Sequence, residues 1–216
     1  MDSPFMFDFI KKTKPVKPII TAAYNPLAGE AFKEISEDVV YSMGPETIIE
    51  DIFNFIDSKK DNDIVFAIDA TGSMKNDIEK LKNDLLPALY DFFGEHANTR
   101  LGLLLYRDYG DSYKYKELPI KLFSFTDNFE TFSNNLKSVR IYGWEGGDIP
   151  EAVYEAMYGS VAFFNWREDV NRQIILIGDA EPHPTPRGSG KYTKEYVTRL
   201  AEMEGIKIKS ILLPED

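Results

Sequence analysis

Short apolar runs alternate with amphipathic segments from residue 63 to residue 213, and this alternation limits the folds open to the chain. We expect strands at 63–68, 100–106, 118–125, 173–177 and 206–213, and helices at 75–93, 128–139, 150–164 and 191–204. The third strand follows a polar stretch and is expected to form a hairpin with the second. The pattern predicts an α/β fold, with a doubly wound, mostly parallel, Rossmann-like sheet and helices on both faces.

Residues 1–60 are less regular. Pro15, Pro18 and Pro26 break any long helix there, whereas residues 45–55 have helical spacing of apolar side chains. Farther along, Pro87 is expected to kink or locally break the helix at 75–93. We therefore expect an N-terminal extension, residues 1–60, packed on a domain formed by residues 61–216.

Composition excludes several classes of function. The net charge of −11 argues against nucleic-acid binding. The chain has no cysteine, so disulfides, thiolate zinc sites and cysteine nucleophiles are excluded. No apolar run reaches the roughly 18 residues of a membrane span, and residues 1–17 lack the apolar stretch of a secretory signal. The compartment stays open, the outside of the cell included if the chain is a trimmed fragment.

Oxygen-bearing side chains follow the first apolar strand. Asp69 comes at its end, and Thr71 and Ser73 lie on the turn into the next helix. Carboxylate and hydroxyl oxygens suit a hard divalent cation such as Mg²⁺. The alternative is structural, with Asp69 capping the helix and the two hydroxyl residues forming an ordinary turn.

Polar residues also follow other strands of the expected sheet. Arg107 and Asp108 follow the second strand, Asp179 follows the strand at 173–177, and the loop 142–151 leads into a helix. The carboxyl ends of parallel strands meet at one edge of such a sheet, around its topological switch point, where ligands bind. These segments are therefore expected to converge.

The segments resemble the von Willebrand factor type A (vWA) family, whose metal-ion-dependent adhesion site has the motif Asp-x-Ser-x-Ser, a distant Thr and a distant Asp. Asp69-Ala-Thr71-Gly-Ser73 is similar to the first part, and Asp179 to the final Asp. The resemblance extends from about residue 63 to residue 213. The subgroup with hemicentin and the atypical alpha-kinases is the most similar, through Tyr106-Arg-Asp-Tyr109, Gly146-Gly-Asp-Ile-Pro-Glu151 and Gly178-Asp-Ala-Glu-Pro-His183.

The resemblance implies a protein-interaction or adhesion domain that is not an enzyme. In such domains the hydroxyls hold Mg²⁺, Mn²⁺ or Ca²⁺, the Asp residues often act through water, and one coordination position stays open. A protein partner fills that position with a Glu or Asp carboxylate. For this chain we expect the metal ligands to be Asp69, Thr71, Ser73, Asp148 and Asp179.

Two features depart from the family pattern. The distant Thr is not evident, and Asp148 is the best candidate to replace it, although Asp148 serves equally well as the cap of a helix starting near Pro150. The family's last strand and helix are also missing. We expect the first 60 residues to cover the sheet edge that would otherwise be exposed.

Four residues near the expected site are candidates for partner contact: Arg107, Trp144, Glu145 and His183. For Arg107 an ion pair with Asp108 is favoured instead. For His183 an exposed position in the loop is favoured over a ligand role. Trp144 is either an exposed anchor for the partner or a lid packed on the sheet, and the sequence does not separate the two.

A haloacid-dehalogenase-like phosphatase is the competing class, because it also places an Asp after its first strand. That chemistry needs a second acid two positions later to protonate the leaving group, and Thr71 occupies this position. Gly188-Ser-Gly-Lys191 suggests a phosphate loop but lacks its upstream Gly and its final Ser or Thr. A third interpretation is a scaffold that binds partners without a metal.

Overall fold

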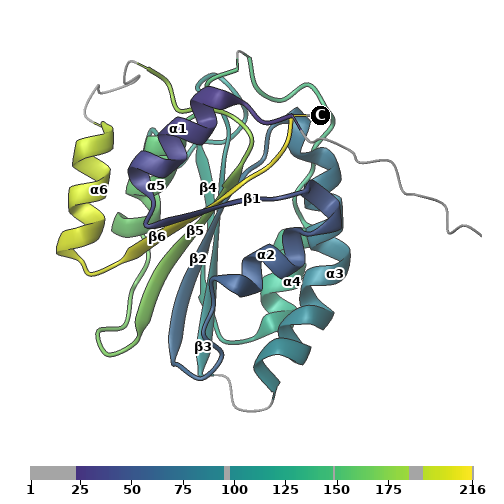
Figure 1. Cartoon of the computed structure of the whole chain (residues 1–216), viewed down its shortest axis with the longest axis vertical. Coiled ribbons are helices and arrows are strands. Elements are labelled where there is room, and N and C mark those ends of the chain that lie inside the picture. The colour runs from purple at the N-terminus through teal and green to yellow at the C-terminus, as the bar shows by residue number, and fades with distance from the viewer. Residues whose placement is uncertain (1–22, 95–97, 148, 185–191, 216) are drawn as a thin grey trace, which may run out of the picture.

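The computed structural model describes residues 23–94, 98–147, 149–184 and 192–215. Within them the chain forms one six-stranded sheet with the order β1-β6-β5-β2-β3-β4 (Figure 1). Neighbouring strands are parallel except for β4, which runs antiparallel to β3. The strands are β1 (Asp38–Tyr41), β2 (Asn62–Asp69), β3 (Thr99–Tyr106), β4 (Ile120–Thr126), β5 (Asn171–Gly178) and β6 (Lys207–Leu212).

Helices cover both faces of this sheet, which confirms the doubly wound α/β fold. They are α1 (Pro26–Ile35), α2 (Ile48–Asn54), α3 (Lys75–Phe93), α4 (Phe129–Lys137), α5 (Val153–Ala162) and α6 (Lys194–Met203). The helices α2, α3 and α4 pack on one face, and α1, α5 and α6 on the other. No helix of the described residues has both the length and the hydrophobicity to cross a bilayer.

The central strand β2 explains the continuous apolar run of the sequence. Ile64, Phe66 and Ile68 belong to the core under α2–α4, whereas Val65 and Ala67 belong to the core under α1, α5 and α6. Successive side chains of a strand point to opposite faces, and both faces are buried here. A strand that is buried on both faces lacks the alternating polar positions of a strand with one face in water.

The elements expected after residue 60 are present, including the hairpin of β3 and β4. Of the two effects expected at Pro87, a kink or a local break, the break is wrong, because α3 continues through the proline. Proline removes one helical hydrogen bond, but Leu85 and Leu89 on either side are buried against the sheet. Their packing holds the helix across the proline.

The region before residue 60 contains two elements that the sequence did not predict. Helix α1 starts at Pro26, which occupies the first turn, where the missing N–H costs nothing. Asn25 caps it by accepting hydrogen bonds from the backbone of Leu27 and Ala28, at 3.0 and 3.2 Å. Strand β1 pairs in parallel with β6. The edge of β6 is therefore covered by a strand from the beginning of the chain.

Candidate metal and partner site

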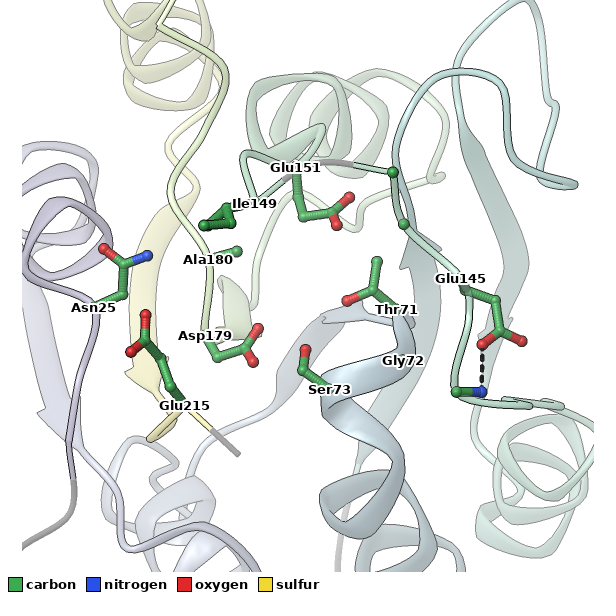
Figure 2. Close-up of a pocket in the computed structure, with 13 residues that line it drawn as sticks. Asn25, Thr71, Gly72, Ser73, Glu145, Ile149, Glu151, Asp179, Ala180 and Glu215 are labelled. Carbon is green, nitrogen blue, oxygen red and sulfur yellow. Dashed lines mark hydrogen bonds between the residues drawn. The ribbon is translucent and has the colours of Figure 1, made fainter.

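A pocket of about 380 Å³ opens at the carboxyl end of the parallel strands, beside the start of α3 (Figure 2). Its walls come from the segments after β2 and β5, from the loop before α5, and from both described ends of the chain. The lining residues are Asn25, Thr71, Gly72, Ser73, Gly143, Glu145, Gly146, Gly147, Ile149, Glu151, Asp179, Ala180 and Glu215. The segments expected to converge at this edge therefore do so.

Asp69 lies beneath the pocket at the end of β2 and is fully buried. Its Oδ1 accepts hydrogen bonds from the backbone N–H and the hydroxyl of Thr71, at 2.9 and 2.7 Å. Its Oδ2 has no hydrogen-bond partner among the described residues. Because the Thr71 hydroxyl gives its hydrogen to Asp69, its lone pairs stay available to the pocket. Both described hydrogen bonds of the Asp69 side chain come from Thr71, which precedes α3. The cap position of α3 is Met74, and no side chain makes a capping hydrogen bond there.

Burial, and after it the nearby charge of Asp179, raises the pKa of Asp69 to about 7. The hydrogen bonds from Thr71 act in the opposite direction and only partly offset this rise. The Tyr106 phenol below has a raised pKa, because it is buried and faces the same two carboxylates. The charge of Asp179 thus makes ionisation of Asp69 at the base of the pocket less favourable.

Two further oxygen-bearing side chains, those of Ser73 and Asp179, reach the pocket. Figure 2 shows their side chains pointing toward one another, with the Thr71 side chain beside them. Ser73 is exposed at the start of α3, whereas Asp179 follows β5 and is buried. Of the five metal ligands expected from the sequence, Asp69, Thr71, Ser73 and Asp179 meet at this pocket.

Glu151 is a buried carboxylate of the pocket that the sequence analysis did not propose as a ligand. Its backbone N–H donates to the carbonyl of Glu181 at 2.9 Å, which joins its loop to the segment after Asp179. Gly146 makes room for it: a Cβ at position 146 would lie 2.9 Å from the Glu151 Oε1, and the φ of +89° also favours glycine there. From the sequence, Asp148 is the ligand candidate in the segment Gly146–Glu151.

Asp148 itself lies outside the described residues, so its ligand role stays a prediction. The expected helix start near Pro150 is wrong, because α5 begins at Val153 with Ala152 at the cap position. The chain before it instead forms a bridge between Glu151 and Pro182. The alternative that Asp148 caps this helix therefore loses its basis.

The donor set suits a hard cation only if hydroxyls and water take part. Among the described residues, no three His, Asp or Glu side chains gather closely enough to hold a metal by themselves. The oxygens of Thr71, Ser73 and Asp179, with Asp69 behind them, match the preferences of Mg²⁺, Mn²⁺ and Ca²⁺. The buried Oδ2 of Asp69 has no hydrogen-bond partner in the part of the chain that the structure describes, which is consistent with such an ion.

Arg107 lies inside the protein and supports the site from below. Its Nε donates to the carbonyl of Ala70 at 2.8 Å, and its guanidinium forms ion pairs with Asp111 and Glu145 at 3.4 and 3.6 Å. Among the described residues, the Asp108 carboxylate contacts the imidazole of His183 rather than the guanidinium of Arg107. Arg107 is thus a structural residue of the loops around the pocket.

Two expectations for the loops are settled by burial. The expected exposed position of His183 is wrong, because its ring is buried and its Nε2 lies 2.5 Å from the Asp108 carboxylate. Trp144 is 76% exposed and stacks on Tyr142, so the interpretation as a lid packed on the sheet is also wrong. Glu145 accepts the backbone N–H groups of its own loop.

Comparison with known proteins supports the fold and leaves the family open. No protein-family model matches the chain. The chain is similar to alpha-protein kinase vwkA of Dictyostelium discoideum, with 28% identity over 125 residues, which are 57% of this chain and 19% of that protein. It therefore spans about a fifth of the length of this curated relative.

Two solved structures are also similar. The pilus adhesin SpaC from Lactobacillus rhamnosus GG has 14% identity and a TM-score of 0.51 over 71% of this chain and 24% of SpaC. The conserved hypothetical protein BatB from Bacteroides thetaiotaomicron has 22% identity and a TM-score of 0.45 over 69% of this chain and 65% of BatB. At this identity the likeness to SpaC shows a shared fold.

Proposed function

We propose that this chain is a vWA-type domain that binds a divalent cation and, through it, a protein partner. The proposal rests above all on one observation: the Thr71 hydroxyl, oriented by the buried Asp69, meets Ser73 and Asp179 at one pocket at the carboxyl end of the sheet. These are the residues that match the adhesion-site motif in the sequence.

In the proposed site the hydroxyls of Thr71 and Ser73 hold Mg²⁺ or Mn²⁺, with Asp69 and Asp179 acting directly or through water. The cation supplies a Lewis-acidic position that accepts an oxygen from outside the chain. A Glu or Asp side chain of the partner is the expected donor. The buried Asp69 orients the Thr71 hydroxyl, and the two carboxylates balance the charge of the cation.

Adhesion is the role that we propose for this site, without enzymatic turnover. SpaC, which shares the fold, is a pilus adhesin. At the position where a phosphatase of the competing class needs its proton donor, this chain has Thr71, whose hydroxyl does not serve as a general acid near neutral pH. Measured phosphatase turnover that Asp69→Ala abolishes would contradict the proposed role.

Calorimetric titration of chelator-treated protein with Mg²⁺ and Mn²⁺ tests the metal site. We expect one saturable site in the wild type and none in Asp69→Ala, with the far-UV circular dichroism of the variant unchanged. Asp91→Ala is the matched control, because it removes an exposed carboxylate near the far end of α3. Absence of binding in the wild type, or equal binding by Asp69→Ala, would overturn the proposal.

A further inference from the structure

A second hollow of about 350 Å³ lies beside the metal pocket. It is lined by Asp108, Tyr109, Gly110, Asp111, Trp144, Glu145, Gly146 and Gly147. The last three of these residues also line the metal pocket, so they form a shared wall. A ligand bound in the metal pocket therefore lies next to the hollow.

Trp144 gives this hollow an aromatic wall. Its ring stacks on Tyr142 with the centroids 5.1 Å apart and the planes at 11°. The two side chains are 76% and 60% exposed, and Ile149 at the rim of the metal pocket is 66% exposed. Large exposed aromatic side chains next to a pocket are typical of partner contacts, in which tryptophan and tyrosine are enriched.

The loop that carries these rings is held in place by hydrogen bonds. The Glu145 carboxylate accepts the backbone N–H groups of Tyr142, Gly143 and Trp144, at 2.8, 2.8 and 3.2 Å. The Glu145 carbonyl accepts the N–H of Gly72 at 3.1 Å. A Cβ at position 72 would lie 2.8 Å from the Gly143 carbonyl carbon, so the loop rests directly on the segment between Thr71 and Ser73. The aromatic pair is thus fixed relative to the metal pocket.

The hollow is negatively charged, and the described residues that line it include no Lys or Arg. Burial raises the pKa of Asp111 and of Glu145, but hydrogen bonds from backbone N–H groups outweigh it, so that both pKa values lie below the usual range. Both carboxylates are therefore ionised at neutral pH. The buried Arg107 pairs with both and offsets only one of the two charges.

We propose that this hollow receives an arginine or lysine side chain from the same partner segment whose carboxylate reaches the cation. The inference rests on the proposed function and adds a second requirement to the partner. A guanidinium is attracted both by the face of an indole ring and by carboxylates. An apolar side chain would contact Trp144 as well, but it would not balance the one negative charge that Arg107 leaves on Asp111 and Glu145.

Peptide titrations followed by NMR test the pairing of charges. The probes are acetyl-Glu-(Gly)n-Arg-amide, with zero to three glycines, and the same peptides with citrulline, the neutral analogue of arginine. The chain has two tryptophans: Trp144 reports on the hollow, and Trp166, whose indole N–H donates to the Ser160 carbonyl, serves as an internal reference. With saturating Mg²⁺, we expect the best-spaced arginine peptide to bind roughly five- to tenfold more tightly than its citrulline partner and to shift only the Trp144 indole signal.

Trp144→Leu is the matched variant, because it keeps an apolar side chain at this exposed position and removes the aromatic face. We expect it to abolish the preference for arginine while leaving Mg²⁺ affinity unchanged in calorimetry. Equal affinities of arginine and citrulline peptides at every spacing would overturn the inference, as would a preference that survives Trp144→Leu. Tighter binding of a leucine peptide would overturn it in favour of an apolar partner.

A metal-free arm separates this inference from the proposed function. In the presence of a chelator, acetyl-arginine-amide at millimolar concentration should still shift the Trp144 signal more than acetyl-citrulline-amide. If it does so while Mg²⁺ fails to bind, the metal site is wrong and the acidic, arginine-binding hollow stands. If Mg²⁺ binds at one site but arginine gains no advantage in either arm, the hollow is wrong and the metal site stands.

Discussion

The buried carboxylate of Asp69 makes the stability of the metal-free protein depend on pH, and Asp69→Asn tests this dependence. The pKa of Asp69 is raised to about 7 in the folded chain, from an ordinary value of 3.8. Below pH 3.8 the residue is protonated in both states and costs nothing. Between pH 3.8 and 7 the unfolded chain releases the proton while the folded chain keeps it, so the free energy of unfolding falls as the pH rises.

The size of the effect follows from the two pKa values. At about 1.4 kcal/mol per pKa unit, the difference corresponds to roughly 4 kcal/mol of lost stability above pH 7. Asparagine is neutral at every pH, and its Oδ1 can accept the same hydrogen bonds from Thr71. We therefore expect Asp69→Asn to stabilise the chelator-treated protein at pH 8 by up to about 4 kcal/mol, with the gain vanishing near pH 4.

Urea unfolding of the wild type and Asp69→Asn, followed by circular dichroism with a chelator at pH 4 to 8, measures this gain. Asp91→Asn, an exposed acid of α3, is the control and should show no such trend. Saturating Mg²⁺ at pH 8 should stabilise the wild type and leave Asp69→Asn unchanged. The reasoning is refuted if Asp69→Asn is less stable than the wild type at pH 8, or if the difference between them does not change with pH.

Three further changes test the packing and the donor set. Gly178→Ala should destabilise the protein by about 1–3 kcal/mol in urea unfolding, because the new Cβ would lie 2.6 Å from the Tyr106 hydroxyl; unchanged stability would contradict this. Deletion of residues 1–55 should cause unfolding or aggregation in size-exclusion chromatography, because it removes β1 from the edge of β6; a soluble, cooperatively folding truncation would disprove it. Glu151→Gln should weaken Mg²⁺ binding roughly tenfold if Glu151 replaces the distant Thr, whereas a loss confined to Asp148→Ala would assign that place to Asp148.

The fold was predictable because its signals are local. The apolar run of β2 and the helical spacing of α3 each decide their own element, and alternation of such elements leaves few architectures. Asp69, Thr71 and Ser73 lie next to one another in the sequence, so their convergence depends on a single turn. Parallel strands then bring Asp179 to the same edge.

The features that escaped prediction depend on contacts between distant segments. β1 is four residues long and has no fully buried residue, so only its pairing with β6 reveals it. Glu151 enters the pocket because its loop pairs with the segment after Asp179. The buried His183 contacts the carboxylate of Asp108, which lies 75 residues earlier in the sequence.

Anomalous diffraction from crystals soaked in Mn²⁺ tests the central claim most directly, because it locates the cation. The account predicts one strong peak in the pocket, within coordination distance of the hydroxyl oxygens of Thr71 and Ser73, and no such peak in Asp69→Ala crystals. A Mn²⁺ peak held only by other acidic side chains, or an empty pocket at saturating Mn²⁺, would contradict it.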